Sequence, residues 1–150
     1  MALKGDRHEL DTDISFFINE TAEKGQVVSV STQGSGAAMD SSAALCTVAA
    51  EASGALPLGI ILNDVVNLDL TRQHINWHKD EVQQGGKVTI LRKGFVVTDQ
   101  ISGTPTAGAT AYVADSGKIS ATQDGTAVAI GSFLSTKDAD GYAKVAINLP

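Results

Sequence analysis

The sequence predicts an all-β domain, built as a small barrel or sandwich of short strands. Runs of β-branched residues recur at intervals of about 8–12 residues between glycine-rich turns, a spacing typical of such folds. No segment keeps a helical period for more than about three turns. Of the 150 residues, 43% are hydrophobic but only 5% are aromatic, so we expect a core made mainly of Val, Ile, Leu and Ala.

The chain divides by composition into an acidic arm, residues 1–24, and a β-rich body, residues 25–150. The arm holds six acidic and three basic side chains. Residues 13–23 fit one short helix with Asp13 as N-cap. However, Phe16, Phe17 and Ile18 are consecutive, which fits neither a helical stripe nor a strand alternation. An apolar cluster in a polar arm indicates docking onto a partner, and folding back onto the body is the alternative.

Short apolar runs mark the strands of the body, and their flanking residues mark the turns. Pro57 stands at the entry of a buried strand, where its missing N–H costs least. Gly94 is expected as the bulge or turn of a hairpin-like pair, and Ser116–Gly117 as the tip of a hairpin. Residues 44–50 fit either a strand or a short helix. The expected strands cover residues 26–32, 44–50, 57–62, 65–71, 87–98, 111–120, 127–134 and 143–149.

The last run has the clearest alternation. Ala143, Val145, Ile147 and Leu149 are apolar at every second position. Since side chains of a strand alternate between its two faces, these four are expected to point inward.

One polar segment, residues 72–81, resembles a functional site. His74 and His78 are four residues apart, as in zinc-binding pairs on a helix, but no third His or Cys lies nearby. Trp77 is the only tryptophan and has mostly polar neighbours. Trp and Arg are enriched in binding hot spots, so we expect Arg72, His74, Trp77 and His78 to form an interface rather than a metal site.

Composition and missing motifs exclude several other functions. A net charge of −6 disfavours nucleic-acid binding, and the apolar runs are too short for a membrane helix. No phosphate loop or Gly-x-Ser-x-Gly motif occurs, so we expect neither an enzyme nor a cofactor. Asp138 and Asp140 are expected in an ordinary turn, since no acid closes a calcium loop. Cys46 is expected to be a small buried thiol.

The order of these runs resembles the head decoration (cement) proteins of tailed bacteriophages. The quoted runs are Gly25-Gln-Val-Val, Pro57-Leu-Gly-Ile-Ile-Leu, Ala107–Ile119, Gly131-Ser-Phe-Leu and Ala143–Leu149. The stretch Leu70–Glu81 resembles the distinctive segment of a podovirus-type subgroup. Together they cover roughly residues 25–149.

The resemblance implies a structural protein, made in the host cytoplasm, that binds the outer surface of the capsid. Its implied partners are the major capsid protein and two further copies in a homotrimer; no residue is implied as catalytic. On this basis Phe16, Phe17 and Ile18 are expected as apolar anchors on the capsid. The alternative is a soluble ligand- or carbohydrate-binding β module, or a fibre-base adaptor of the virion.

Overall fold

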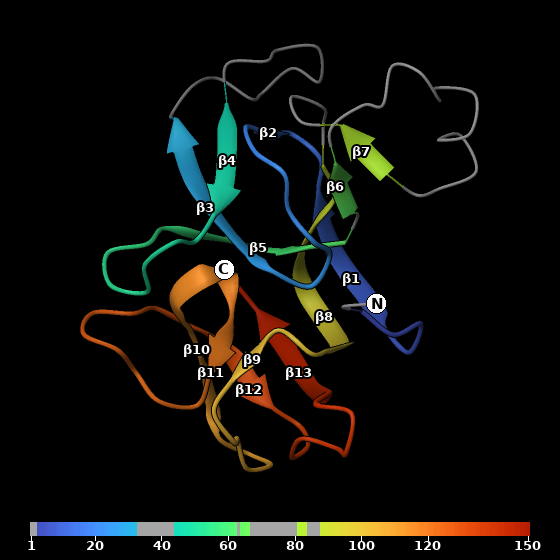
Figure 1. Ribbon diagram of the computed structural model, residues 1–150, viewed down its shortest axis with the longest axis vertical. Coiled ribbons are helices and arrows are strands. Elements are labelled where there is room, and N and C mark those ends of the chain that lie inside the picture. Colours follow the sequence, from blue (N-terminus) through green and yellow to red (C-terminus); the bar gives the residue numbers. More distant parts are fainter. Residues whose placement is uncertain (1–2, 33–43, 63, 67–80, 84–87) are drawn as a thin grey trace.

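The computed structural model describes residues 3–32, 44–62, 64–66, 81–83 and 88–150, and these residues are almost entirely β (Figure 1). One 3₁₀ turn, η1 (Asp115–Gly117), is the helical exception among them. The strands are β1 (His8–Asp13), β2 (Phe17–Ile18), β3 (Val27–Thr32), β4 (Leu45–Val48), β5 (Pro57–Ile61), β6 (Asp64–Val66), β7 (Glu81–Gln83), β8 (Ile90–Thr98), β9 (Ile101–Ser102), β10 (Thr110–Val113), β11 (Ile119–Ser120), β12 (Ala129–Phe133) and β13 (Ala143–Asn148).

Eleven of the described strands form one sheet, in the order β2-β4-β3-β5-β8-β13-β12-β10-β11-β9, with β1 paired to β8 off this path. Strands β6 and β7 form a separate parallel pair. The prediction of an all-β domain is confirmed, and the sheet does not close into a barrel. Figure 1 shows β2–β5 on one side of β8 and β9–β13 on the other.

Strand β8 joins these two groups because it has three partners. Ile90 and Leu91 pair with β5, and residues 93–98 pair with β13. Phe95 lies opposite both His8 of β1 and Ala146 of β13, so β1 and β13 occupy opposite edges of β8. The expected hairpin over residues 87–98 is therefore wrong, since these residues include one continuous strand.

Gly94 is the reason why the sequence suggested a turn at this place. Its φ is +140°, and a Cβ there would lie 1.9 Å from the carbonyl oxygen of His8. The residue allows β1 to approach β8 closely, and the register of β1 is irregular from Glu9 onward. A glycine that serves close packing looks the same in sequence as one that serves a turn.

The described residues build two hydrophobic cores, and the strands between them are buried on both faces. Adjacent residues of β3, β5 and β8 point to different cores, as in the pairs Val27/Val28, Ile60/Ile61 and Leu91/Ile90. The main core consists of Leu3, Val27, Ala49, Ile60, Leu62, Leu91, Val96, Ile101, Ala111, Val113, Ile119, Ile130, Phe133, Ala143, Val145, Ile147 and Leu149. The second core consists of Ile18, Ala22, Val28, Cys46, Leu58, Ile61, Val88 and Ile90.

Residues 13–23 form no helix, which corrects the expected short helix with Asp13 as N-cap. The Asp13 carboxylate does accept a hydrogen bond from an amide, that of Ser15 at 3.1 Å, but this bond closes a turn after β1. Phe16 and Ile18, two positions apart, both reach the second core, and Ala22 completes its cover. Their burial, rather than the local charge pattern, decides the backbone of this segment.

Several sequence predictions are confirmed. Strand β5 begins at Pro57, residues 45–48 form a strand rather than a helix, and the four alternating residues of 143–149 are all buried. Ser116 and Gly117, with φ of 61° and 71°, form the tip between β10 and β11. Their amides donate to the carbonyls of Ala50 and Ala49, so this tip packs on the end of β4. Residues 67–71 of the expected strand 65–71 lie outside the described residues.

Both described ends of the chain are fastened to β8. Leu3 is buried in the main core and forms a bridge to Thr98. At the other end, Arg92 donates one hydrogen bond to the carbonyl of Leu58 (2.9 Å) and one to that of Pro150 (2.5 Å). The amide of Leu149 donates in turn to the carbonyl of Arg92 at 3.0 Å.

Replacing Gly94 by Ala tests the close approach of β1 to β8. We expect the G94A protein to lose about 1–3 kcal/mol of unfolding free energy, because the new methyl group meets the His8 carbonyl and the backbone is strained at this φ. Urea unfolding measures the loss. The matched control is Gly5→Ala, where no atom lies within 4 Å of the added Cβ. Equal stabilities of the two variants would contradict the packing role of Gly94.

Candidate interaction surfaces

The polar segment predicted to form an interface lies outside the described residues. Arg72, His74, Trp77 and His78 all fall within 67–80. Their assignment to an interface rather than a metal site therefore stays a prediction from the sequence.

The three predicted anchors of the acidic arm occupy different environments. Ile18 is fully buried in the second core, which leaves none of its side chain exposed to a partner. Phe16 is half-buried and packs against the same core, and Phe17 is also half-buried. The arm pairs with the body through β1 and β2, which bond to β8 and β4. The division into an arm and a body stays a prediction.

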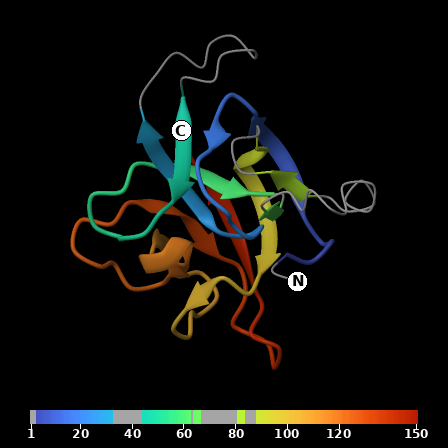
Figure 2. The same ribbon diagram turned by 45° about the horizontal axis from the view of Figure 1, so that its top comes forward.

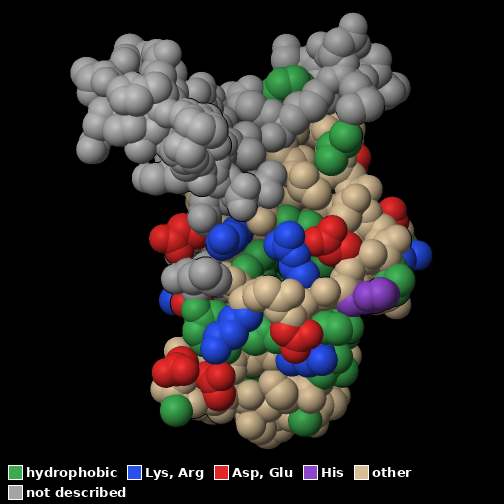
Figure 3. All heavy atoms as spheres, turned by 90° about the vertical axis from the view of Figure 1, so that its right-hand side faces the viewer, with side chains coloured by type: hydrophobic (Ala, Val, Ile, Leu, Met, Phe, Trp, Pro, Cys, Tyr) green, Lys and Arg blue, Asp and Glu red, His purple; other side chains and the backbone are tan. Residues whose placement is uncertain are grey.

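A groove lies on the outward face of β1, β8 and β13, where sequence analysis expected no site. We call it the apolar groove; its volume is about 310 Å³. Leu10 and Leu134 in its wall are 70% and 48% exposed. Figure 3, which faces the side of β1 and β8, shows hydrophobic side chains between charged ones. The lining residues are His8, Leu10, Lys93, Gly94, Phe95, Leu134, Ala146, Ile147 and Asn148.

Phe95 forms the aromatic part of this groove and is held between two cationic or polar groups. The His8 ring stacks on it, with the ring centroids 5.8 Å apart and the planes 21° apart. The Lys144 ammonium lies 4.1 Å from the centre of the same ring, a cation–π contact. Lys93 also lines the groove, so an apolar surface carries lysine charges at its edge.

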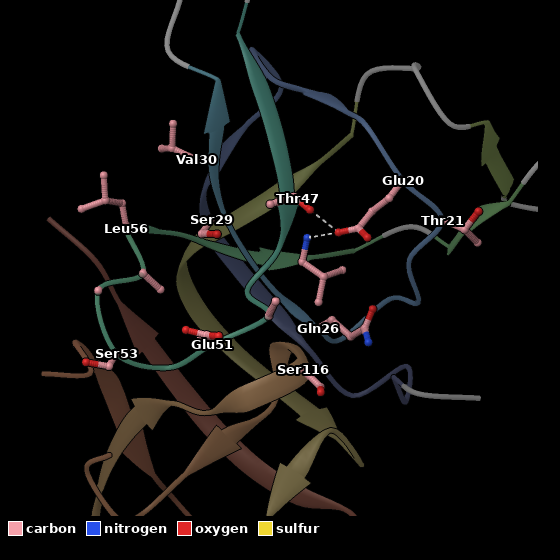
Figure 4. A pocket seen from close by; sticks show the side chains of 14 residues that line it. Glu20, Thr21, Gln26, Ser29, Val30, Thr47, Glu51, Ser53, Leu56 and Ser116 are labelled. Atoms are coloured by element: carbon pink, nitrogen blue, oxygen red, sulfur yellow. Dashed lines mark hydrogen bonds between the residues drawn. The ribbon is translucent and has the colours of Figure 1, made fainter. Parts of the chain in front are cut away.

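A second hollow lies against β3, β4 and the loop between β4 and β5. We call it the acidic depression; its volume is about 740 Å³ (Figure 4). The Glu20 carboxylate accepts hydrogen bonds from the Thr47 hydroxyl and from the Val48 amide, the latter at 2.6 Å. Its lining residues are Glu20, Thr21, Gln26, Ser29, Val30, Thr47, Val48, Ala50, Glu51, Ser53, Gly54, Ala55, Leu56 and Ser116.

Glu20 also protects the exposed edge of β4. Strand β2 pairs only with Leu45 and Cys46. Beyond that point the carboxylate of Glu20 takes the Val48 amide that another strand would otherwise bond. Edge strands with free amides recruit other strands, so this contact blocks such pairing.

The described residues contain no cluster of three metal-ligating side chains. The expected turn at Asp138 is present: its carboxylate accepts the amides of Tyr142 and Asp140, each at 2.9 Å. The Tyr142 amide contributes most to lowering the pKa of this carboxyl below its ordinary value. None of the helical turns in the described part of the chain has the length and apolarity of a membrane span.

Cys46 is a buried free thiol, as the sequence predicted. Burial, with a smaller contribution from the nearby Glu20 carboxylate, raises the pKa of this thiol to about 12. A thiol that keeps its proton is a poor nucleophile and a poor metal ligand. Cys46 is therefore a packing residue of the second core.

Comparison with known families assigns the chain. The model of the structural cement protein family (E217 gp24/Pam3 gp6) matches residues 6–148, a range that contains every strand described above. The chain belongs to this family. As a cement protein it is a structural component of the phage virion that decorates and stabilises the capsid. No curated protein matches the sequence.

The two isoleucines near the end of the arm provide a matched test of the second core. We expect Ile18→Ala to lower the unfolding free energy of the cement protein by about 2–5 kcal/mol, because it leaves a cavity in the second core. Ile14, 40% exposed, is the control, and its alanine variant should change stability by no more than about 0.5 kcal/mol. Chemical denaturation measures both. A stable I18A protein would show that the segment is not part of the fold.

The raised pKa of Cys46 predicts how the thiol reacts and how stability changes with pH. In the native protein at pH 8 we expect almost no reaction with a thiol reagent, and full reaction after unfolding. The ordinary pKa is 9.0, so the unfolded chain loses the proton first as the pH rises. The contribution of the thiol to stability is thus complete below pH 9 and is lost between pH 9 and about 12. Cys46→Ala should show a shallower decline over this range; rapid native labelling would contradict the assignment.

Proposed function

We propose that this cement protein binds the major capsid protein on the outer surface of the shell as a homotrimer, and ties neighbouring capsid subunits together. The observation that carries the proposal is membership in the cement family over residues 6–148. A homotrimer also suits a small chain with few large aromatic residues, since burial between copies adds to its limited core. The protein acts as a structural part rather than as an enzyme.

The capsid contact is assigned to residues from two parts of the sequence. Trp77 supplies apolar area, and Arg72, His74 and His78 supply hydrogen bonds across the contact. Phe16 and Phe17 of the arm add apolar contacts, since both side chains are partly exposed. Ile18 acts indirectly, because its burial in the second core fixes the position of the two phenylalanines.

Capsids that lack the cement protein provide the direct test. Purified protein is mixed with these capsids. We expect saturable binding, with three copies of the protein at each site, visible by sedimentation and by cryo-electron microscopy. Capsids carrying the protein should also withstand a higher temperature. Binding to free sugars in place of capsids would support the ligand-binding module instead, and single isolated copies on the shell would contradict the homotrimer.

Substitution of the single tryptophan tests the assigned contact. We expect Trp77→Ala to weaken capsid binding roughly thirty-fold, about 2 kcal/mol, while the isolated protein keeps its melting temperature. Trp77→Phe keeps much of the aromatic area and should bind better than the alanine variant. A chelator should change nothing. Release by chelator with recovery in zinc would favour a metal site, and unfolding of W77A would place the residue in a core.

A further inference from the structure

We infer that copies of this cement protein contact each other head to tail: the apolar groove of one copy receives the Leu56 rim of the next, and the groove's lysines face the neighbour's acidic depression. The inference rests on the proposed homotrimer and assigns its interface. The two surfaces lie on opposite sides of the chain (Figures 1 and 2), with β1 on one side and the loop between β4 and β5 on the other. A contact between them is heterologous, and such contacts close into rings when the rotation allows.

The groove is an apolar surface that nothing in the described chain covers. Leu10 and Leu134 stand exposed on its two walls, and Phe95, Ala146 and Ile147 complete it. Five large apolar side chains of the described residues are exposed, and three of them, Leu10, Leu134 and Leu56, belong to the two surfaces of this contact. Exposed apolar side chains that gather on a grooved surface mark an interaction site.

Charge selects the occupant of the groove. Lys93 lines it, and the Lys144 ammonium lies over the Phe95 ring at its edge. The acidic side chains of β1 offset the charge of these lysines only in part. Asp11 lies opposite Lys93 in the register, but Glu9 already pairs with Arg7 at 2.9 Å. On a chain of net charge −6, the groove is thus a surface that another acidic copy can approach.

The acidic depression offers the complementary chemistry. Glu20 and Glu51 supply its charge, and Leu56 and Val30 supply an apolar rim (Figure 4). Leu56 is 57% exposed, directly before β5. An apolar side chain beside carboxylates matches an apolar groove beside lysines, so one sequence provides both halves of the contact.

Paired cysteines test the geometry. In the wild-type fold, residues 10 and 56 lie on opposite sides of one chain, so the L10C/L56C protein should form disulfides only between copies. On assembled capsids, mild oxidation should give covalent dimers and closed trimers on a non-reducing gel. Each single variant should form no covalent dimer and should run as a monomer on this gel. Cys46 is too deeply buried to react. Covalent dimers from L10C alone would show a symmetric contact and overturn the inference, as would absence of cross-links in the double variant.

Serine variants and charge reversal test the energetics. We expect Leu10→Ser and Leu56→Ser each to weaken association of copies about ten-fold or more, whereas Val128→Ser, 40% exposed elsewhere, should not. Lys144→Glu and Glu51→Lys should each weaken association, and the double variant should recover part of the loss. Unchanged melting temperatures confirm that each variant is folded.

The outcomes separate this inference from the proposed function. If wild-type copies form trimers on the capsid but the groove variants do so equally well, the interface assignment falls and the homotrimer stands. If the L10S protein forms trimers but no longer binds capsids, the groove contacts the major capsid protein, which overturns the inference. If wild-type copies never associate, the homotrimer itself is rejected.

Discussion

Strand β8 is the element on which the rest of the cement protein depends. One of its edges is shared by β5 and then β13, and β1 occupies the opposite edge. Because of this sharing, the two groups of strands belong to one sheet while each helps to enclose a core. Adjacent side chains of β8, Ile90 and Leu91, point into different cores and link them. Gly94 allows β1 to take the opposite edge, because a Cβ there would meet the carbonyl of His8.

The sequence predicts elements well where one face of a strand is buried and the other is wet. Residues 143–149 are such a case, because their alternation survives in the structure. Where both faces are buried, as in β3, the sequence predicts the strand but not which core each side chain enters, since Val27 and Val28 carry no alternation. The prediction for the acidic arm was wrong for another reason. The charged residues of β1 outweighed the apolar pair Phe16 and Ile18, whose spacing of two is typical of a strand.

The candidate surfaces show the same division. Trp77 is a candidate from the sequence alone, because a single tryptophan among polar neighbours can be recognised within one short segment. The apolar groove could not be found in this way, since its walls come from β1, β8, β13 and the residue after β12. Only the register, which sets His8, Phe95 and Ala146 side by side, brings these residues together. Alternation in β8 and β13 gives the outward residues, but not the order of the strands.

The fastening of both chain ends to β8 has a mechanical consequence. Strands β1 and β13 run antiparallel to β8 on its two edges, so they run parallel to each other. A pull on the start of β1 and the end of β13 is then directed along the strands, in shear. Backbone hydrogen bonds lie across the strands, so under shear those of each pair share the load and must fail nearly together. Tension applied through the termini meets the stiffest direction of the molecule, whereas tension across the sheet would open it bond by bond.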